Sequence, residues 1–363
     1  MQSVIIGSNQ AGQRLDKFLH KYLPQAGTGF LYKMLRKKNI ILNGKKAEGS
    51  ELLTQGDQVC FFFSQETFDK FSGQSGDLHL VDRMLSEYRT AYHELNNINV
   101  IYEDEHILIL DKPAGILTQK AAAGDLSLNE WMIGYLLSKN PDFEKELPGF
   151  HPSVCNRLDR NTSGLVLCGK TMPGLQYLSR LIKERSIKKY YRTICLGQLQ
   201  EEVLVRGYLV KDQKKNKVRV ETEGSDAAGF CIKAGESGAT GFCIETVESG
   251  TMKGSYIETA YKPIRTGEYF TLLEVELITG KPHQIRAHLA SIGHPLIGDF
   301  KYGDRRTNRI IQDRYGLQHQ LLHAFQVIFP ESSESAGIAV SEKSFTADCP
   351  LLFKRLQSEL GLL

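Results

Sequence analysis

The sequence predicts an α+β fold, and three features of its patterning support that prediction. Strand-like runs recur along residues 99–278 with few helical patterns between consecutive strands, which favours a mostly antiparallel mixed sheet. Helical patterns near 126–138, 173–185 and 282–292 are expected to form helices that flank this sheet. Two amphipathic patterns and a few short strands before residue 64 predict a small, separate N-terminal α/β domain.

The N-terminal domain is expected to span residues 1–63. Its two helices are indicated by apolar residues at helical spacing, namely Leu15, Phe18, Leu19 and Tyr22, then Phe30, Leu31, Met34 and Leu35. Asn43 and Gly44 form a strong tight-turn signal directly after the strand-like residues 40–42. A further strand is expected at 59–63, which completes a compact module of two helices and several strands.

The rest of the chain divides by changes in regularity. Residues 64–98 are less regular, with a piece rich in Ser, Gly and Gln followed by a polar stretch with some helical character, and we expect them to form an interdomain linker. Residues 99–330 are expected to form the large domain, with 331–363 as a C-terminal extension packed on it. Within 222–255, a short motif that begins Gly-Phe-Cys-Ile occurs twice, and two copies are too few for a solenoid. We therefore expect a flexible surface insertion at 222–255.

The composition is that of a globular protein. Hydrophobic residues make up 41% and charged residues 24% of the 363, and the net charge is only +3, so composition alone does not indicate a nucleic-acid binder. The seven cysteines are scattered, without the density of a disulfide scaffold or paired Cys-x-x-Cys spacing, and are expected to be reduced. With no signal-peptide pattern and no apolar stretch of about 18 residues, we expect a cytoplasmic protein without membrane association.

Positive charge is concentrated in the N-terminal domain. Residues 1–60 contain nine Lys and Arg against four Asp and Glu, a local excess of +5 that exceeds the +3 of the whole chain. Cations gathered into one patch bind phosphates by releasing counterions. The cations expected to contact RNA are Arg14, Lys17, Arg36, Lys37, Lys38, Lys45 and Lys46. Lys and Arg at a helix C-terminus also complement the helix dipole, so charge alone leaves both interpretations open.

Residues 156–165 contain the strongest candidate for chemistry. Asp159 lies between Arg157 and Arg160, and small hydrogen-bonding residues follow before an apolar strand. A carboxylate between guanidinium groups stays ionised, and in a loop at a strand edge it is positioned to attack or to accept a proton. The alternative is a structural Asp–Arg pair that fixes the loop through Asx-type hydrogen bonds.

Two sets of segments resemble known families. Residues 14–19, 35–37, 41–45 and 56–59 are similar to the RNA-binding domain named after ribosomal protein S-four, which implies binding to folded RNA. In the same order along the chain, residues 111–115, 157–165, 189–193 and 279–289 resemble motifs of the Rlu-type pseudouridine synthase family, and the similarity extends through 293–299 and 302–303.

The second resemblance implies an RNA uridine isomerase that acts on large-subunit ribosomal RNA. It identifies Asp159 as the catalytic carboxylate, Tyr191 as the active-site tyrosine and Arg286 as the partner of Asp159. The chain departs from the family at Lys281 and Pro282, where Arg and Thr are common, and at Asn156, where His is frequent. Those departures bear on substrate detail and leave the three central residues intact.

Further substrate contacts are expected around these residues. A stacked uridine must be flipped out of its helix, and by family analogy Arg157 fills the gap that it leaves. The expected substrate-binding residues are Arg157, Arg160, Thr162, Lys189, His283 and Gln284. The chain has no phosphate-binding loop or dinucleotide fingerprint, and its histidines lack a third ligand at metal spacing, so no cofactor and no metal are expected.

Structured RNA, chiefly ribosomal RNA, is the expected partner, without an obligate protein partner. Transfer RNA stays open as the substrate. Two alternatives belong to other classes: a non-catalytic RNA-binding factor in ribosome assembly, and a carboxylate-dependent hydrolase. The hydrolase requires a second acidic group, and residues 156–165 offer arginines in its place.

Overall fold

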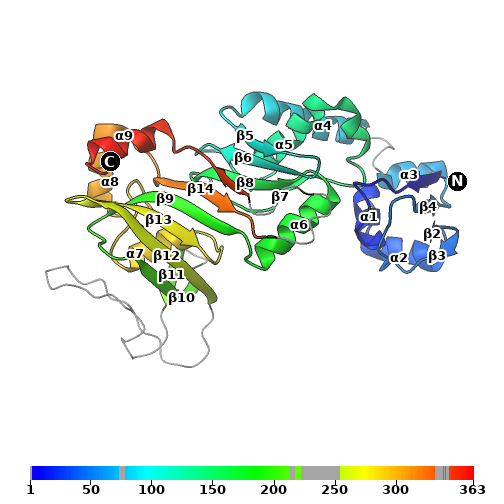
Figure 1. Ribbon diagram of the computed structural model, residues 1–363. Coiled ribbons are helices and arrows are strands. Elements are labelled where there is room, and N and C mark those ends of the chain that lie inside the picture. Colours follow the sequence, from blue (N-terminus) through cyan, green and yellow to red (C-terminus); the bar gives the residue numbers. More distant parts are fainter. Residues whose placement is uncertain are drawn as a thin grey trace.

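The computed structural model describes residues 2–72, 78–212, 217–221, 254–331, 338, 340 and 343–363. In this part of the chain, two sheets with flanking helices form an α+β architecture, which confirms the predicted fold class (Figure 1). Apart from its last two residues, the insertion expected at 222–255 lies outside the described residues. No described helix is long and apolar enough to cross a membrane.

The N-terminal sheet has four strands, all paired antiparallel, in the order β1-β4-β2-β3. The strands are β1 (Gln2–Ile5), β2 (Ile40–Leu42), β3 (Lys45–Lys46) and β4 (Gln58–Phe61). Asn43 and Gly44 connect β2 to β3 with φ values of 49° and 73°, the left-handed backbone that a tight hairpin turn requires. The helices α1 (Leu15–Tyr22) and α2 (Thr28–Arg36) bury the apolar residues predicted from their spacing, including Phe18 and Leu31.

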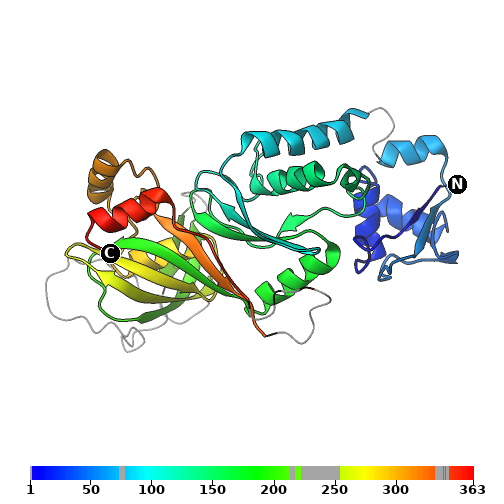
Figure 2. The ribbon, with the colours of Figure 1, turned by 45° about the horizontal axis from the view of Figure 1, so that its top comes forward.

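Two helices occupy most of the stretch expected to be a linker. Helix α3 (Gln65–Ser72) places Phe68 in the N-terminal core, whereas α4 (Leu78–Glu94) packs on α5 (Leu128–Lys139) of the large domain (Figure 2). A Cβ atom added to Gly134 of α5 would lie 2.2 Å from the carbonyl oxygen of Tyr88, so the two backbones approach very closely. The connection is therefore mainly helical, while the domain limits at 63 and 98 stay a prediction.

The large sheet contains 11 strands within the described ranges. Its order is β11-β10-β12-β13-β9-β14-β8-β6-β5, with β7 paired to β8 and β15 paired to β14. Only the β8–β14 pair is parallel among these residues, so the prediction of a mostly antiparallel mixed sheet is confirmed. The strands are β5 (Asn99–Glu103), β6 (Ile107–Lys112), β7 (Ser153–Val154), β8 (Ser163–Gly169), β9 (Lys188–Leu196), β10 (Val203–Asp212), β11 (Lys217–Glu221), β12 (Ser255–Thr266), β13 (Phe270–Leu277), β14 (Leu322–Ile328) and β15 (Ser344–Thr346).

Helices cover both faces of the sheet around β6 and β8. Leu108 and Leu110 of β6 pack in the core that contains α5, and the alternating Ile107 and Ile109 pack against α6 (Met172–Lys183) on the other face. Burial on both faces explains why β6 and β8 are continuous apolar runs. The remaining helices are the 3-10 helix η1 (Pro141–Lys145), α7 (Gln284–Ser291), α8 (Arg305–Tyr315) and α9 (Leu351–Glu359), the last of which packs near α8 at the end of the chain.

The N-terminal domain contacts the large domain near α6 (Figures 1 and 2). The Gln13 side chain donates a hydrogen bond of 3.1 Å to the carbonyl of Gly149, and Gln176 of α6 donates to the carbonyl of Gly12. The ammonium group of Lys21 lies 5.8 Å from the ring centre of Phe150. Polar and cation–π contacts therefore hold α1 and the turn before it against α6 and the segment at 149–150.

The close approach of α4 and α5 predicts a large effect of a single methyl group. Gly134→Ala is expected to lower the free energy of unfolding by about 1–3 kcal/mol, because the added Cβ overlaps the Tyr88 carbonyl. Gly29→Ala in α2 is the matched control, since no atom lies within 4 Å of its added Cβ. This control is expected to leave stability unchanged or raise it by up to about 1 kcal/mol. Equal unfolding midpoints in urea for both variants would contradict the α4–α5 packing.

Candidate functional site

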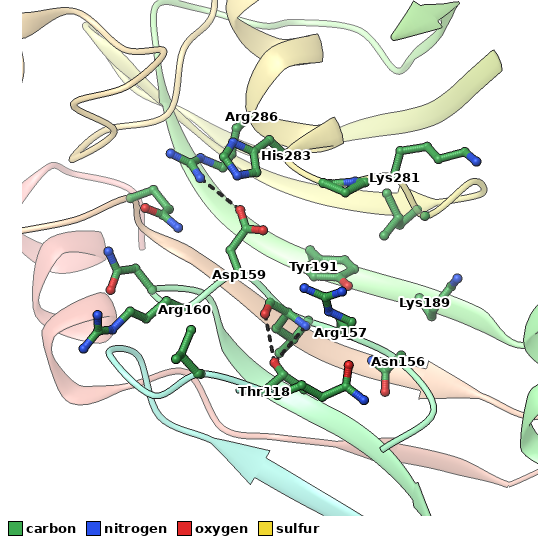
Figure 3. A pocket seen from close by; sticks show the side chains of 18 of the residues that line it. Thr118, Asn156, Arg157, Asp159, Arg160, Lys189, Tyr191, Lys281, His283 and Arg286 are labelled. Atoms are coloured by element: carbon green, nitrogen blue, oxygen red, sulfur yellow. Dashed lines mark hydrogen bonds and ion pairs between the residues drawn. The ribbon is translucent and has the colours of Figure 1, made fainter. Parts of the chain in front are cut away.

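A cavity of about 630 Å³ opens beside Asp159 at the junction of β8, β9 and α7 (Figure 3). Charged and polar side chains from segments far apart in the sequence line it. They include Thr118, Gln119, Asn156, Arg157, Asp159, Arg160, Lys189, Tyr191, Lys281, His283, Arg286 and Gln320. A second cavity of about 50 Å³ shares Arg157, Asp159, Tyr191, His283 and Arg286 with the first. Most residues predicted from the sequence are thus brought together.

The loop that carries Asp159 is pinned on both sides of this residue. The Thr118 hydroxyl donates a hydrogen bond of 2.8 Å to the carbonyl of Leu158 and accepts one of 3.1 Å from its N–H. The N–H of Thr162 donates to the carbonyl of Asp159 across 3.0 Å. Because the backbone is held on either side, the carboxylate is presented to the cavity in a fixed position.

Lys112, at the end of β6, supports the same loop through hydrogen bonds from its ammonium group. Its side chain is completely buried, and Nζ donates to the carbonyls of Pro113, Ile116 and Arg160 at 3.0, 2.9 and 3.1 Å. Arg160 in turn donates from Nε to the carbonyl of Gly115 across 2.9 Å. The 111–115 motif therefore supports the loop that carries Asp159. Burial lowers the pKa of Lys112 to about 7, although Asp159 and Asp111 oppose that shift.

A buried ion triad defines the chemistry of the site. Arg286 donates from Nη1 to Asp159 across 2.9 Å, and from Nε and Nη2 to the two oxygens of Asp299 across 2.7 and 2.9 Å. Asp299 is 1% exposed and Arg286 7%, whereas the side chain of Asp159 is 25% exposed. Asp299 therefore fixes two nitrogens of the guanidinium group, and the third faces the only carboxylate of the triad that reaches solvent.

The pKa shifts of the two buried members agree with this pairing. Burial raises the pKa of Asp299, but the hydrogen bonds and charge of Arg286 outweigh it and hold that pKa below its ordinary value. Burial lowers the pKa of Arg286, but Asp299 and then Asp159 raise it above the ordinary value. Both groups are ionised throughout the physiological range, so the triad carries one net negative charge when Asp159 is ionised.

Tyr191, in the middle of β9, lies beside Asp159 at the wall of the cavity (Figure 3). The residue is 5% exposed, and burial, followed by the charge of Asp159, raises its pKa well above the ordinary value. Its hydroxyl is consequently a neutral phenol at physiological pH. The ring provides an apolar surface next to the carboxylate.

His283 occupies a strained position at the start of α7. Its φ of 57° lies in the left-handed region, which is uncommon for a residue with a side chain and is concentrated at functional sites. The ring Nδ1 lies 3.0 Å from the Tyr302 hydroxyl, and the imidazole lines both cavities. Burial lowers the pKa of His283, although Asp159 opposes the shift, so the imidazole is neutral at physiological pH.

The other predicted substrate-binding residues differ in how they reach the cavity. Arg157 is exposed at the cavity, and Lys189 lines it while half-buried, with a pKa lowered by burial and then by Arg185. Thr162 and Gln284 are each 2% exposed and line only the smaller cavity. The Gln284 amide is fully engaged with Thr259, Thr279, the Glu258 carbonyl and the Lys281 N–H, so it shapes the turn before α7.

All seven cations predicted to contact RNA in the N-terminal domain are exposed. Arg14 is partly engaged by Asp16 at 2.8 Å. Arg36, Lys37 and Lys38 end α2 directly before β2, and Lys46 pairs with Ile41 of that strand. Figure 1 shows that β2 and β3 lie beside each other in the N-terminal sheet, and α2 ends directly before β2, so these cations lie in neighbouring elements.

The sequence did not assign a role to three supporting residues. Lys112 and Asp299 lie inside the motif segments. The signal for Lys112 was a charged residue next to an apolar strand, and the signal for Asp299 was a charged residue next to a glycine turn. Thr118 had no signal of its own. The side-chain amide of Asn156 bonds to the backbone of β8. It accepts a hydrogen bond from the N–H of Leu167 and donates one to the carbonyl of Leu165. Within the described ranges, no three His, Cys, Asp or Glu side chains are grouped as metal ligands.

Comparisons with known proteins agree on one family. A model of the family described as RNA pseudouridylate synthase matches residues 106–291. The chain is 28% identical over 330 residues to ribosomal large subunit pseudouridine synthase C of Vibrio vulnificus, covering 91% of this chain and 88% of the relative. It is 28% identical over 331 residues to the Escherichia coli protein of the same name, covering 90% and 88%.

A solved structure shares the fold. Human RNA pseudouridylate synthase domain containing 4 superposes with a TM-score of 0.54 at 18% identity, covering 77% of this chain and 97% of the human chain. At this identity the likeness concerns the fold alone. It agrees with the mixed sheet and flanking helices described above.

The buried ammonium of Lys112 predicts both a stability loss and a pH dependence. Lys112→Met is expected to lower the free energy of unfolding by about 2 kcal/mol, because buried carbonyls lose their donor. Between pH 7 and 10.5 the unfolded chain keeps the lysine proton that the folded chain has lost, so the stability due to Lys112 increases with pH. The difference between wild type and variant should therefore grow over this interval in urea unfolding. The control Lys188→Met, at an exposed site, should show neither effect.

Proposed function

The chain belongs to the RNA pseudouridylate synthase family, and we propose that it isomerises particular uridines of large-subunit ribosomal RNA with Asp159 as the catalytic carboxylate. The observation that carries this proposal is the position of Asp159. Its carboxylate faces a cavity of about 630 Å³ while one nitrogen of Arg286 holds it at 2.9 Å. The same carboxylate lies beside the ring of Tyr191.

The reaction requires no redox step and no energy input. The bond between uracil N1 and ribose C1′ breaks, the base turns, a bond forms from C5 to C1′, and the proton lost from C5 balances the one gained at N1. Asp159 can attack the ribose, add to the base or remove a ribose proton. Each of the three routes needs an anion in place, and Arg286 supplies its counter-charge.

Tyr191 is proposed to pack against the flipped uracil. Because its phenol stays neutral, it suits apolar contact and hydrogen-bond donation better than proton removal as a phenolate. Arg157, exposed at the cavity, is proposed to occupy the stack that the uridine leaves. Its planar guanidinium group can stack on bases and donate hydrogen bonds to them.

Lys189 and His283 are proposed to contact the nucleotide directly. Lys189 offers a cation inside the cavity for a phosphate oxygen, and the neutral imidazole of His283 offers a hydrogen-bonding group next to Asp159. Thr162 and Gln284 are proposed to act through the shape of the loops, since both are almost fully buried. Arg160 donates from Nε to the carbonyl of Gly115, and the residue is exposed. Its guanidinium group is therefore proposed to contact RNA as well.

The choice of ribosomal RNA rests on two supports. The curated relatives are named as ribosomal large subunit synthases, and the N-terminal domain, similar to the S-four RNA-binding domain, exposes seven cations. These cations are proposed to hold structured RNA while the target uridine enters the cavity. With this substrate we expect the protein in the cytoplasm, where bacterial ribosomes assemble.

Loss of the Asp159 charge is expected to abolish the reaction without abolishing RNA binding. Unmodified transcripts of large-subunit ribosomal RNA and of transfer RNA are incubated with wild type, Asp159→Asn and the control Asp142→Asn, and pseudouridine is mapped by chemical modification and primer extension. We expect discrete sites in ribosomal RNA with wild type and control, and none with Asp159→Asn. Sites only in transfer RNA would correct the target, and no modification of any RNA would favour the assembly-factor alternative.

Asp299 is expected to matter for turnover more than for binding. Asp299→Asn removes the charge that fixes Arg286, so kcat should fall by about 100-fold while the KM for RNA stays near wild type. Glu274→Gln is a matched control because it breaks another carboxylate–arginine pair of 2.9 Å, to Arg192, outside the cavity lining. A variant with unchanged kcat and only a lower melting temperature would reduce Asp299 to a structural role.

A further inference from the structure

Helix α8 carries an unusual concentration of positive charge on its outer face. Its sequence, RRTNRIIQDRY, contains four arginines and one aspartate. Asn308, Ile311 and Tyr315 face the core, whereas Arg305, Arg306, Arg309 and Arg314 are exposed. Among the described residues, no salt bridge joins Arg305, Arg306 or Arg309 to a carboxylate, although the charge of Arg306 helps to lower the pKa of the neighbouring Asp304.

The positions of these arginines do not stabilise the helix itself. Arg305 and Arg306 lie in the first turn, where the positive end of the helix dipole disfavours cations. The carboxylate of the N-cap Asp304 accepts a hydrogen bond from the N–H of Thr307 and is the one acidic group among the described residues at this end of α8. Arg309 lies four residues after Arg305 and three residues after Arg306, so the three like charges are neighbours on the helix surface. An external anion would relieve the repulsion among the three arginines.

The helix is tied firmly to the catalytic site. Asn308 accepts from the N–H of Gly298 across 2.8 Å and donates to the carbonyl of Asp299 across 2.9 Å. Asp299 in turn holds Arg286, the partner of Asp159. Any group bound to the exposed face of α8 is therefore held at a fixed position relative to the catalytic carboxylate.

Helix α8 also lies at the end of the molecule away from the N-terminal domain. Figures 1 and 2 both place β8, β9 and β14, the strands around the site, between that domain and α8. The family model ends at residue 291, so this helix lies outside the matched segment. It is a feature that the shared catalytic core does not account for.

We infer that Arg305, Arg306 and Arg309 form a second RNA-binding surface, which binds phosphates of the substrate RNA on the far side of the target uridine from the N-terminal domain. This rests on the proposed RNA substrate. Guanidinium groups match phosphate oxygens with two parallel hydrogen bonds, and three of them along one helix face suit a backbone with regularly spaced charges. The rigid link between α8 and the Asp159 site favours RNA over an acidic protein as the partner. A substrate RNA must be held in register with Asp159, whereas an acidic protein would not need this link.

The test compares the salt dependence of RNA binding. Full-length wild type and the triple variant Arg305→Gln, Arg306→Gln, Arg309→Gln are titrated onto a labelled transcript of large-subunit ribosomal RNA between about 50 and 200 mM salt. Each lost phosphate contact reduces the slope of log K against log salt by about 0.7–0.9, so we expect a reduction of about 2. The triple Lys variant keeps the charges and should retain the slope.

A control with the same change of charge guards against a general electrostatic effect. Arg83→Gln, Arg89→Gln, Lys145→Gln removes three exposed cations that already pair with carboxylates, at Glu87, Glu144 and Asp142. An unchanged slope in the α8 variant, or an equal reduction in this control, would overturn the inference. Because binding is read without turnover, absence of any pseudouridine would defeat the proposed function and leave this result standing.

Discussion

The ion triad of Asp159, Arg286 and Asp299 is the interaction on which the rest of the site depends. Two buried charges are costly unless each is paired and hydrogen-bonded, and here Asp299 satisfies Arg286 through two bonds while the N–H groups of Lys301 and Tyr302 satisfy Asp299. Because Arg286 is already neutralised, its contact with Asp159 orients that carboxylate and leaves a net negative charge in the triad. The proposed reaction needs an anion at Asp159. The Arg286–Asp299 pair keeps this carboxylate in position, and the triad as a whole stays negatively charged.

The sheet explains how three distant segments meet at this point. The parallel pairing of β8 with β14 brings Gly164 against Ala324, where an added Cβ would lie 2.2 Å from the Ala324 carbonyl, so only glycine permits the approach. Since β14 also pairs with β9, the loop before β8 lies one strand away from β9, which carries Tyr191, while Lys112 at the end of β6 donates to the carbonyl of Arg160 in that loop. The rigidity of the site follows from a strand core that is covered on both faces.

Periodicity predicted the parts of the fold that it governs directly. The helices expected near 126–138, 173–185 and 282–292 are α5, α6 and α7, because each carries a recurring apolar face or a long apolar run. It did not reveal α8, which is polar on most sides. It indicated only some helical character in the stretch that forms α4, whose packing depends on the space that Gly134 leaves in another helix. Asp159 and Arg286 were assigned roles through their motifs. Asp299 lies inside a motif segment and Thr118 outside them, but the contacts of both are tertiary, so their roles could not be read from local patterns.

Base flipping gives a physical reason for binding surfaces away from the cavity. Taking a uridine out of its helix costs a few kcal/mol, and uracil itself is too small to recover that cost and also gain specificity from a single ring contact. In the proposed reaction, binding energy from the rest of the RNA must then hold the flipped state at the carboxylate of Asp159. Phosphate contacts suit this task, because they fix register without reading sequence. Cations on both sides of the cavity would hold the two flanks of the flipped nucleotide at once, so that the RNA backbone could not relax back into a stacked helix.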